Sequence, residues 1–387
     1  MKVGLSTLTQ IGKEYIMEVL EFMNTHDNWE ELLTQPPYNI IVKRDEEYIL
    51  LKYNQLSSDF SIPIVRECRG SIFYKNENGK YECVARAFDK FGNYGESYVP
   101  KIDWHSAVVE EKVDGSLMKV WHHNNKWHIS TNGTINAHTA EVDDTGWTFG
   151  RLFDIALGNE LTSYFFTKLD KNMTYMFELV SPRSRCTIFY PETKLYYLGQ
   201  RDMHTMEEYK DYNSTVMSSA GVLFPKVYPL TTIEECLEYV QNMTKDEEGF
   251  VIRDKYFNRI KLKSPQYLMA FHMNNNGAIT VKRILTMMKN NMIDDFMAYC
   301  PEYNDMVNEV LNDIKEVARS LESIWGMCAW AAKCDKKTFA CSIRNFPYND
   351  FLFEKYNHPE LTGMEYIMRR PIKQIKSMIE RNKQNGN

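Results

Sequence analysis

The pattern of apolar and polar positions divides the chain into a mixed part and a helical part. Apolar residues recur at helical spacing within residues 11–23, and short β-branched and aromatic runs follow between residues 38 and 88. Runs of this kind, bounded by turn residues, predict strands. Asn78-Gly79 lies between two of them, and Asn124-Asn125 lies between two more, so both pairs predict tight hairpins.

The same pattern predicts a second group of elements further along the chain. These are helices at residues 147–157 and 161–169, strands at 173–180 and 194–198, a helix capped by Thr232 with Glu235, and a hairpin of 249–253 with 259–263. Beyond about Met273 strand signals cease and amphipathic helices dominate, the longest over residues 302–325. We therefore expect an α+β fold, with antiparallel sheets and flanking helices in residues 1–273 and an all-α domain in residues 274–387.

Composition limits the kinds of function that fit the chain. It has 387 residues and a formal net charge of −6, from 46 Lys+Arg against 52 Asp+Glu. A chain of this length builds two or three domains with cores of their own, which excludes a small disulfide-stapled scaffold. The acidic balance argues against coating nucleic acid through bulk positive charge, so any contact with nucleic acid has to be local.

Local positive charge is densest near the C-terminus. Only Glu380 opposes the basic residues there, which are Arg369, Arg370, Lys373, Lys376, Arg381 and Lys383. This pattern fits either a solvated terminal helix or a patch for RNA phosphates.

Several other classes of protein are disfavoured by missing motifs. The eight cysteines form no C-x-x-C pair, His122, His123 and His128 lack ligand partners at metal spacing, and no G-x-x-x-x-G-K-[ST] loop occurs. No signal peptide or run of 18 apolar residues is present, so we expect an intracellular, cytoplasmic protein with reduced thiols and no membrane partner.

The candidate chemistry centres on the string Glu111-Lys112-Val113-Asp114-Gly115-Ser116-Leu117, which lies just before a predicted strand. A lysine can act as a covalent nucleophile when its amine is neutral, and nearby cations or a metal ion lower its pKa from about 10.4. A K-x-D-G string alone is common and would be a surface turn. The expectation therefore depends on its partners.

Suitable partners occur in order along the chain. Arg69 and Lys90 precede Lys112, Glu178 and Glu248 follow it, and Lys261 and Lys263 share one face of the last predicted hairpin. Two carboxylates suit a divalent ion, while several cations suit a polyphosphate. Together with a lysine nucleophile, they indicate nucleotidyl transfer.

This ordered set resembles the covalent nucleotidyltransferase superfamily of polynucleotide ligases and capping enzymes, and within it phage-type RNA ligase 1. The resemblance spans about Glu67 to Tyr267. It rests on Ser116-Leu117 after the nucleophile string and on the segments ECRGSIF (67–73), FDKFGNYGE (88–96), FELVSPRSR (177–185) and KLK (261–263) followed by Tyr267.

The resemblance implies an ATP-dependent RNA ligase that joins 5′-phosphate and 3′-hydroxyl RNA ends in tRNA repair. Lys112 would form a lysyl-AMP, and Arg69, Lys90, Lys261 and Lys263 would hold ATP phosphates. Glu178 and Glu248 would hold Mg²⁺, with Mn²⁺ able to substitute, and Asp294-Asp295 would be candidates for a second metal ion. Adenine would lie in an apolar slot including Val251 and Leu198, with Glu111 close by, and Gly115 would be a further residue of the nucleotide site. The partner would be single-stranded RNA or tRNA, the source a virus or phage, and no obligate protein partner is expected.

Two departures and three alternatives stay open. The family's second phenylalanine in "F-F-N" is Gly92 here, and a lysine often found near residue 132 is Asn132. The alternatives are a DNA ligase, an mRNA guanylyltransferase and a catalytically dead RNA-binding relative. The first two usually carry an OB-fold where this chain turns helical.

Overall fold

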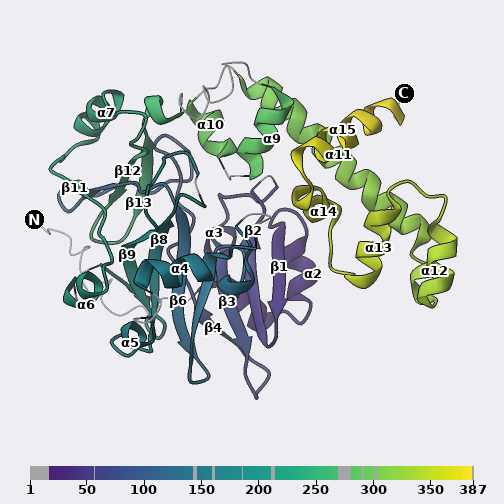
Figure 1. The fold of residues 1–387 in the computed structure, drawn as a ribbon, viewed down its shortest axis with the longest axis horizontal. Helices are drawn as coiled ribbons and strands as arrows, with labels where there is room; N and C mark the ends of the chain where they lie inside the picture. Colours follow the sequence, from purple (N-terminus) through teal and green to yellow (C-terminus); the bar gives the residue numbers. More distant parts are fainter. Residues whose placement is uncertain are drawn as a thin grey trace, which may run out of the picture. The chain divides into compact units, whose positions relative to one another are not determined.

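The computed structural model describes residues 17–55, 57–142, 146–158, 162–184, 186–210, 214–268, 280–289, 292–299 and 303–385. The chain divides into two compact units, Met1–Phe271 and His272–Asn387. The predicted boundary at 273/274 lies close to this division. In Figure 1 every labelled strand lies in the first unit, and helices alone follow from α9 onward.

The first sheet of unit 1 is antiparallel and has the order β1-β2-β3-β4. Its strands are Ile40–Asp45, Tyr48–Tyr53, Arg69–Lys75 and Tyr81–Ala85. Helices α1 (Glu18–Thr25), α2 (Trp29–Thr34) and α3 (Pro63–Glu67) bury apolar side chains against one face. The Asn78-Gly79 turn joins β3 to β4, so that prediction is confirmed. The predicted helix over 11–23 begins outside the described residues.

A five-stranded antiparallel sheet follows, with the order β10-β9-β8-β6-β7. Its strands are β6 (Ser116–His123), β7 (Lys126–Thr131), β8 (Met173–Val180), β9 (Lys194–Asp202) and β10 (Glu208–Tyr209). Helices α4 (Phe149–Leu157) and α5 (Thr162–Phe166) pack on it, and α6 (Ser214–Ser219) follows β10. Asn124 and Asn125 adopt φ values of 47° and 58°, which confirms the predicted hairpin between β6 and β7.

The third sheet has the order β11-β5-β12-β13 and is covered by helix α7 (Ile233–Gln241). Its strands are β5 (Val108–Glu111), β11 (Val227–Tyr228), β12 (Gly249–Arg253) and β13 (Arg259–Lys263). The predicted hairpin of β12 with β13 is confirmed. The Thr232 side chain caps α7 as predicted, while Glu235 reaches back to the amide of Thr231.

The link between the second and third sheets positions the candidate site. Strand β5 belongs to the third sheet and β6 to the five-stranded sheet, and residues 112–115 connect them. Lys112 therefore lies where the two sheets meet.

Unit 2 contains helices and no strand among its described residues. The helices are α9 (Val281–Lys289), α10 (Ile293–Tyr299), α11 (Asn304–Cys328), α12 (Lys336–Ile343), α13 (Asn349–Asn357), α14 (Gly363–Arg369) and α15 (Ile372–Asn385). Helix α11 buries Val307, Val310, Leu311, Ile314 and Val317, the face predicted for it. None of the described helices is long and apolar enough to cross a membrane.

Candidate active site

Lys112 lies in a compact cluster of opposite charges. Its ammonium nitrogen is 2.8 Å from Oε1 of Glu248, and the ammonium of Lys263 is 2.6 Å from the same oxygen. The side chains of Glu248 and Lys263 are almost fully buried, while that of Lys112 is 21% exposed. The structure thus brings together the predicted nucleophile, one predicted metal ligand and one predicted phosphate ligand, with the nucleophile open to solvent.

The β12–β13 hairpin creates this cluster. Gly249 pairs directly with Lys263, and its φ of +136° is a conformation that residues with a side chain rarely adopt. A Cβ atom on Gly249 would lie 2.1 Å from the carbonyl oxygen of Leu262. The amide of Lys112 also donates to the carbonyl of Gly249 at 2.9 Å. Close backbone approach at this glycine therefore places Glu248 between the two lysines.

The two predicted metal ligands have opposite electrostatic environments. Burial would raise the pKa of Glu248, but the charges of Lys112 and Lys263 hold it below its usual value. Burial raises the pKa of Glu178 to about 7, and the negative charge of Glu248 adds to that rise. Glu178 thus lies within electrostatic reach of Lys112 and Glu248, although its pKa is shifted in the opposite direction to that of Glu248.

Strand β8 positions Glu178 through its pairing with β6. Glu178 lies opposite Leu117, in the strand that follows the nucleophile string. A Cβ atom on Gly115 would lie 2.4 Å from the carbonyl oxygen of Leu179 and 3.0 Å from Cγ of Glu178. Gly115 thus allows β8 to approach because it has no side chain. Its place at the nucleotide site stays a prediction.

Asp114, which sequence reasoning left without a role, anchors the surrounding loop. Its Oδ2 accepts hydrogen bonds from the amides of Thr187 (2.8 Å) and Ile188 (2.7 Å), and its Oδ1 accepts one from the hydroxyl of Tyr267 (3.1 Å). Burial and the nearby Glu248 charge raise the pKa of Asp114. Tyr267, the last residue of the segment that resembles the family, therefore contacts the nucleophile string through Asp114. Arg185, which ends the FELVSPRSR segment, lies outside the described residues.

Three of the four predicted phosphate ligands lie near one buried phenol. Burial opposes ionisation of Tyr53, yet the charges of Lys90, Arg69, Lys52 and Lys261 together lower its pKa. A group of four cations around a single side chain matches the requirement of a polyphosphate. The sequence signal for Lys52 was weak, because only the pairing of β2 with β3 places it opposite Arg69.

Aromatic rings orient two of these cations. The Arg69 guanidinium lies 4.5 Å from the ring centroid of Phe88, and the Lys90 ammonium lies 4.2 Å from that of Phe60. The NH1 atom of Arg69 is buried and has no hydrogen-bond partner among the described residues. An unpaired buried donor of this kind is a suitable place for a ligand oxygen.

The departure at Gly92 coincides with close packing of neighbouring side chains. A Cβ atom there would lie 2.3 Å from Oε2 of Glu96, and that carboxylate accepts hydrogen bonds from Asn93. The backbone of this segment pairs with Lys261, whose amide donates to the carbonyl of Gly92 at 3.0 Å. The Glu96 carboxylate and its neighbours occupy the space that a phenylalanine at position 92 would need.

The departure at Asn132 coincides with a buried lysine that sequence reasoning missed. Lys119 is fully buried, and its ammonium donates to the carbonyls of Gly70 and of Thr131, the latter at 3.1 Å. Burial, aided by the charge of Arg69, lowers the pKa of Lys119 to about 7. Its signal in the sequence is a lysine inside the apolar strand LMKVW. Lys119 therefore connects the backbone of β3 with that of β7 at Thr131, the residue before Asn132.

The predicted adenine residues are only partly brought together. Leu198 packs against a cluster that includes Phe88 and Leu117, while Val251 lies on β12 opposite Glu110 and Lys261. The amide of Glu111 donates to the carbonyl of Lys226, and the amide of Lys226 donates to the carboxylate of Glu111. The adenine slot stays a prediction.

The second-metal prediction falls on residues of unit 2. Asp294 and Asp295 belong to α10, in unit 2, and the side chain of Asp295 lies outside the described part of the structure. Within the residues that are described, no group of three or more His, Cys, Asp or Glu side chains could hold a metal ion. The second-metal role of Asp294-Asp295 stays a prediction.

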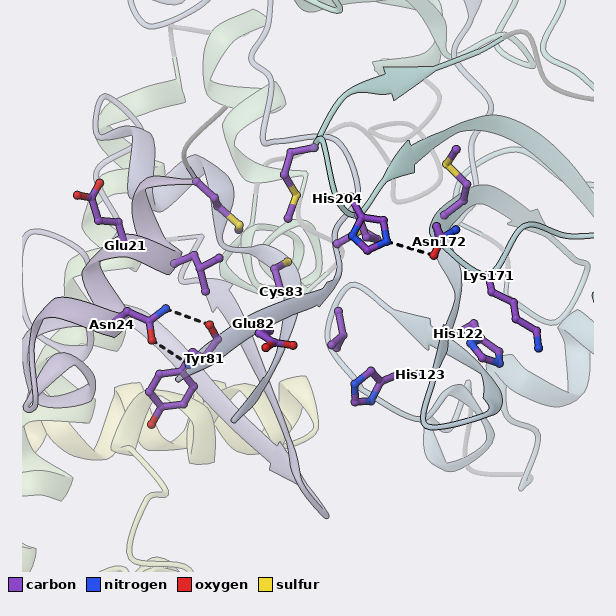
Figure 2. A pocket seen from close by; sticks show the side chains of 16 residues that line it. Glu21, Asn24, Tyr81, Glu82, Cys83, His122, His123, Lys171, Asn172 and His204 are labelled. Atoms are coloured by element: carbon purple, nitrogen blue, oxygen red, sulfur yellow. Dashed lines mark hydrogen bonds between the residues drawn. The ribbon is translucent and has the colours of Figure 1, made fainter. Parts of the chain in front are cut away.

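His122 and His123 line a separate open pocket of about 590 Å³ (Figure 2). Both are half-buried, and a ring nitrogen of His123 is hydrogen bonded to the hydroxyl of Tyr48. Figure 2 shows His204 and Asn172, which are hydrogen bonded, on the wall of the same pocket. The pocket lies at the end of β6 that is remote from Lys112, roughly 23 Å along the strand from Ser116.

Comparison with known sequences places these residues in a family. A family model described as RNA ligase matches residues 67–267, more than half of the chain. A putative bifunctional polynucleotide kinase/RNA ligase of Autographa californica nuclear polyhedrosis virus is 31% identical over 280 residues, 68% of this chain but 39% of the relative. An RNA ligase of Rhodothermus phage RM378 is 23% identical over 368 residues, 80% of this chain and 82% of the relative.

Among solved structures, an archaeal ATP-dependent RNA ligase has a TM-score of 0.44 at 13% identity, covering 78% of this chain and 82% of that one. The matched range of the family model, 67–267, begins just before Arg69 and ends at Tyr267, whose hydroxyl contacts the nucleophile string. It therefore contains the whole Lys112 cluster, and the chain belongs to the RNA ligase family of the phage RNA ligase 1 type.

Proposed function

We propose that this chain is an ATP-dependent RNA ligase that joins 5′-phosphate and 3′-hydroxyl ends of single-stranded RNA or tRNA. The observation that carries the proposal is the partly exposed Lys112 amine, held 2.8 Å from a buried glutamate that also binds Lys263. Four further cations near Tyr53 support a triphosphate site, and one of them, Arg69, also acts on the carboxylate of Glu178. A role in tRNA repair is the specific form of this proposal.

In the first step the Lys112 nitrogen attacks the α-phosphorus of ATP. A P–N bond forms, the bond to the β-phosphate oxygen breaks, and pyrophosphate leaves while the amine loses its proton. In the resting arrangement Glu248 engages the amine. The contact therefore has to be exchanged before the attack, and Lys263 can retain Glu248 when Lys112 leaves.

The residues present fit a divalent cation. Oε2 of Glu248 is buried without a hydrogen-bond partner in the described structure, and Glu178 offers a second carboxylate in the same environment. Mg²⁺ typically binds one or two protein carboxylates together with substrate phosphates. Glu178 and Glu248 would hold the ion, which would neutralise charge on the phosphates, and Mn²⁺ is expected to substitute.

The remaining steps reuse the same groups. The RNA 5′-phosphate attacks the lysyl-AMP and releases the Lys112 amine, and a 3′-hydroxyl then attacks the adenylylated end and releases AMP. Each transfer develops charge on phosphate oxygens, which Arg69, Lys90, Lys261 and Lys263 would stabilise. One set of cations therefore serves three related transfers.

The adduct assay tests the proposal directly. Incubation with ATP labelled at the α-phosphate should label the wild-type chain. Lys112→Ala should form no adduct because it has no amine, and Lys112→Arg should form none because a guanidinium stays protonated. Lys255→Ala, which removes an exposed lysine from the β12–β13 turn, is the matched control. An undiminished adduct in Lys112→Ala would refute the assignment of Lys112 as the nucleophile.

Substrate assays separate the alternatives. Labelling by GTP in place of ATP would indicate a guanylyltransferase, and sealing of a nicked DNA duplex in place of single-stranded RNA would indicate a DNA ligase. RNA binding without any adduct would indicate a catalytically dead relative. We expect ATP labelling and joining of a nicked tRNA anticodon loop.

A further inference from the structure

Two exposed arginines share one tryptophan ring on unit 1. The guanidinium carbons of Arg151 and Arg183 each lie 4.0 Å from the ring centroid of Trp147. The two cations are therefore at most about 8 Å apart, roughly the distance over which physiological salt screens charges, so they repel each other. One cation over a ring is an ordinary surface feature. Two over the same ring concentrate positive charge.

The fold does not compensate this charge. Within the described part of the chain, neither guanidinium has a carboxylate at ion-pair distance or a hydrogen-bond acceptor. Asp154, on the same helix as Arg151, lies 3.0 Å from His138 instead. Arg151 also belongs to the first turn of α4, where the helix dipole disfavours a cation and no acidic residue is present. Stability of the fold therefore gives no reason for the pair.

Stacking positions the two side chains without using their donors. A guanidinium contacts an aromatic ring with its flat face, and its N–H groups point outward in its plane. Trp147 packs against the apolar core under α4, which fixes the ring. The amide of Arg183 donates to the hydroxyl of Ser181 at 3.2 Å, and that hydroxyl is bonded to Thr193 at 2.8 Å. Such fixing in advance lowers the ordering cost of binding a ligand.

Two neighbouring guanidiniums with open donors match the phosphates of a nucleic-acid backbone. Arginine binds phosphate oxygens through two parallel hydrogen bonds. Arg183 follows Glu178 by five residues, so their Cα atoms are at most about 18 Å apart. An RNA strand whose end lies at the Lys112 cluster can therefore reach the pair with phosphates further along its backbone. The triphosphate of ATP already has the cations near Tyr53.

We propose that Arg151 and Arg183, held on Trp147, bind backbone phosphates of the single-stranded RNA whose end is joined at the Lys112 cluster. This inference rests on the proposed function, because it assigns an RNA contact of the same site. It names no new reaction step. The pair contributes to RNA affinity and to its salt dependence, and not to the reaction of Lys112 with ATP.

The test compares wild type with the double variant Arg151→Gln, Arg183→Gln in two assays. The first measures Kd for a single-stranded RNA with a 5′-phosphate over a series of salt concentrations, and the second measures adduct formation with labelled ATP in the absence of RNA. The double variant should raise Kd about tenfold or more. The slope of log affinity against log salt should shrink by about 1.4, because two contacts worth about 0.7 each are lost. Adduct formation should keep its wild-type rate and KM for ATP.

A matched variant controls for the change in net charge. Lys75→Gln, Lys80→Gln removes two exposed lysines at the β3–β4 turn. Its Kd for RNA and its salt slope should stay close to those of the wild type. Equal losses in this variant and in the arginine variant would overturn the inference, because they would show a general effect of charge.

Neutral methylphosphonate linkages identify the phosphates. One such linkage, moved stepwise along the RNA, should weaken binding to the wild type at the positions that the pair contacts. It should cause little further loss in the double variant, because the two changes remove one contact. Equal Kd and equal salt slopes for wild type and the double variant, or a raised KM for ATP in adduct formation, would also overturn the inference. Absence of a wild-type adduct, together with the expected change in Kd, would refute the proposed function alone.

Discussion

At the scale of single residues, the candidate site holds two carboxylates with pKa values shifted in opposite directions. Two lysines keep Glu248 ionised, whereas burial raises the pKa of Glu178 to about 7. Separation of this kind is typical of sites where titratable groups have different tasks. Glu178 would change its charge near neutral pH, so its state can be followed without any substrate.

Glu178→Gln should change how stability depends on pH. A carboxyl whose pKa is raised in the folded state binds a proton there that the unfolded chain has already lost. It therefore lowers the free energy of unfolding as pH rises from about 4.5 to about 7. Glutamine removes this effect, so the melting temperature of Glu178→Gln relative to wild type should be higher at pH 8 than at pH 5.

Calorimetry in the presence of a chelator measures this difference without bound metal. Glu238→Gln, on the exposed face of α7, is the matched control for loss of one carboxylate. If the melting temperatures of wild type and Glu178→Gln changed in parallel with pH, Glu178 would have the same pKa in the folded and the unfolded chain.

Sequence reasoning found the residues with strong motifs and missed those defined by pairing. Lys112, Glu248 and Lys263 lie together as predicted. They could be predicted because each belongs to a motif with a recognisable order and spacing along the sequence. Lys52 joins the cations only through strand register, and Lys119 reaches Gly70 only through burial across two sheets. These distant contacts have no local signature in one sequence.

At the scale of elements, the β12–β13 hairpin sets the geometry of the site. Gly249→Ala should destabilise it, because alanine would have to adopt a φ of +136° with its Cβ 2.1 Å from a carbonyl oxygen. Backbone strain alone costs about 1–3 kcal/mol, and the clash adds to it. We expect a clearly lower melting temperature and loss of the labelled adduct.

A second glycine serves as the control for this substitution. Gly326 lies inside α11, with no atom within 4 Å of an added Cβ. Gly326→Ala should stabilise the chain by up to about 1 kcal/mol, since alanine favours helix. If Gly249→Ala had the same melting temperature and formed as much labelled adduct as the wild type, the hairpin would tolerate a side chain at this position.

Element types with strong periodicity were predictable, and short or irregular elements were not. Both β12 and β13 have the predicted bounds, and α11 buries the predicted face. Strand β5 has only four residues and ends in two glutamates, so nothing in the local pattern marked it. The last of the runs predicted between residues 38 and 88 ends as a strand at Ala85, and the next residue, Arg86, contacts Glu67 and Asp89.

At the scale of the whole molecule, the net charge of −6 hides a terminal basic segment that is partly neutralised internally. Arg370 pairs with Glu354, and Lys383 lies 2.8 Å from Asp313. Ile375 and Ile379 of α15 are buried. Removing the segment would therefore disturb packing as well as charge, so substitution is the cleaner test of RNA contact.

The triple variant Arg369→Ala, Lys373→Ala, Lys376→Ala removes three exposed cations and leaves the internal pairs of Arg370 and Lys383 intact. If unit 2 binds RNA through this face, affinity for tRNA should fall. The slope of log affinity against log salt should shrink by about two to three, because each lost phosphate contact removes somewhat less than one released counterion. The labelled adduct should be unchanged.

A matched variant separates a local contact from a general charge effect. Ala substitutions at Lys333, Lys336 and Lys337, exposed residues in and just before α12, change the net charge by the same amount. Long-range attraction would weaken tRNA binding alike in both variants, whereas a phosphate patch would weaken it only in the first. An unchanged slope in the first variant would identify α15 as a solvated helix. Recognition of RNA would then fall to unit 1, where the cations near Tyr53 lie.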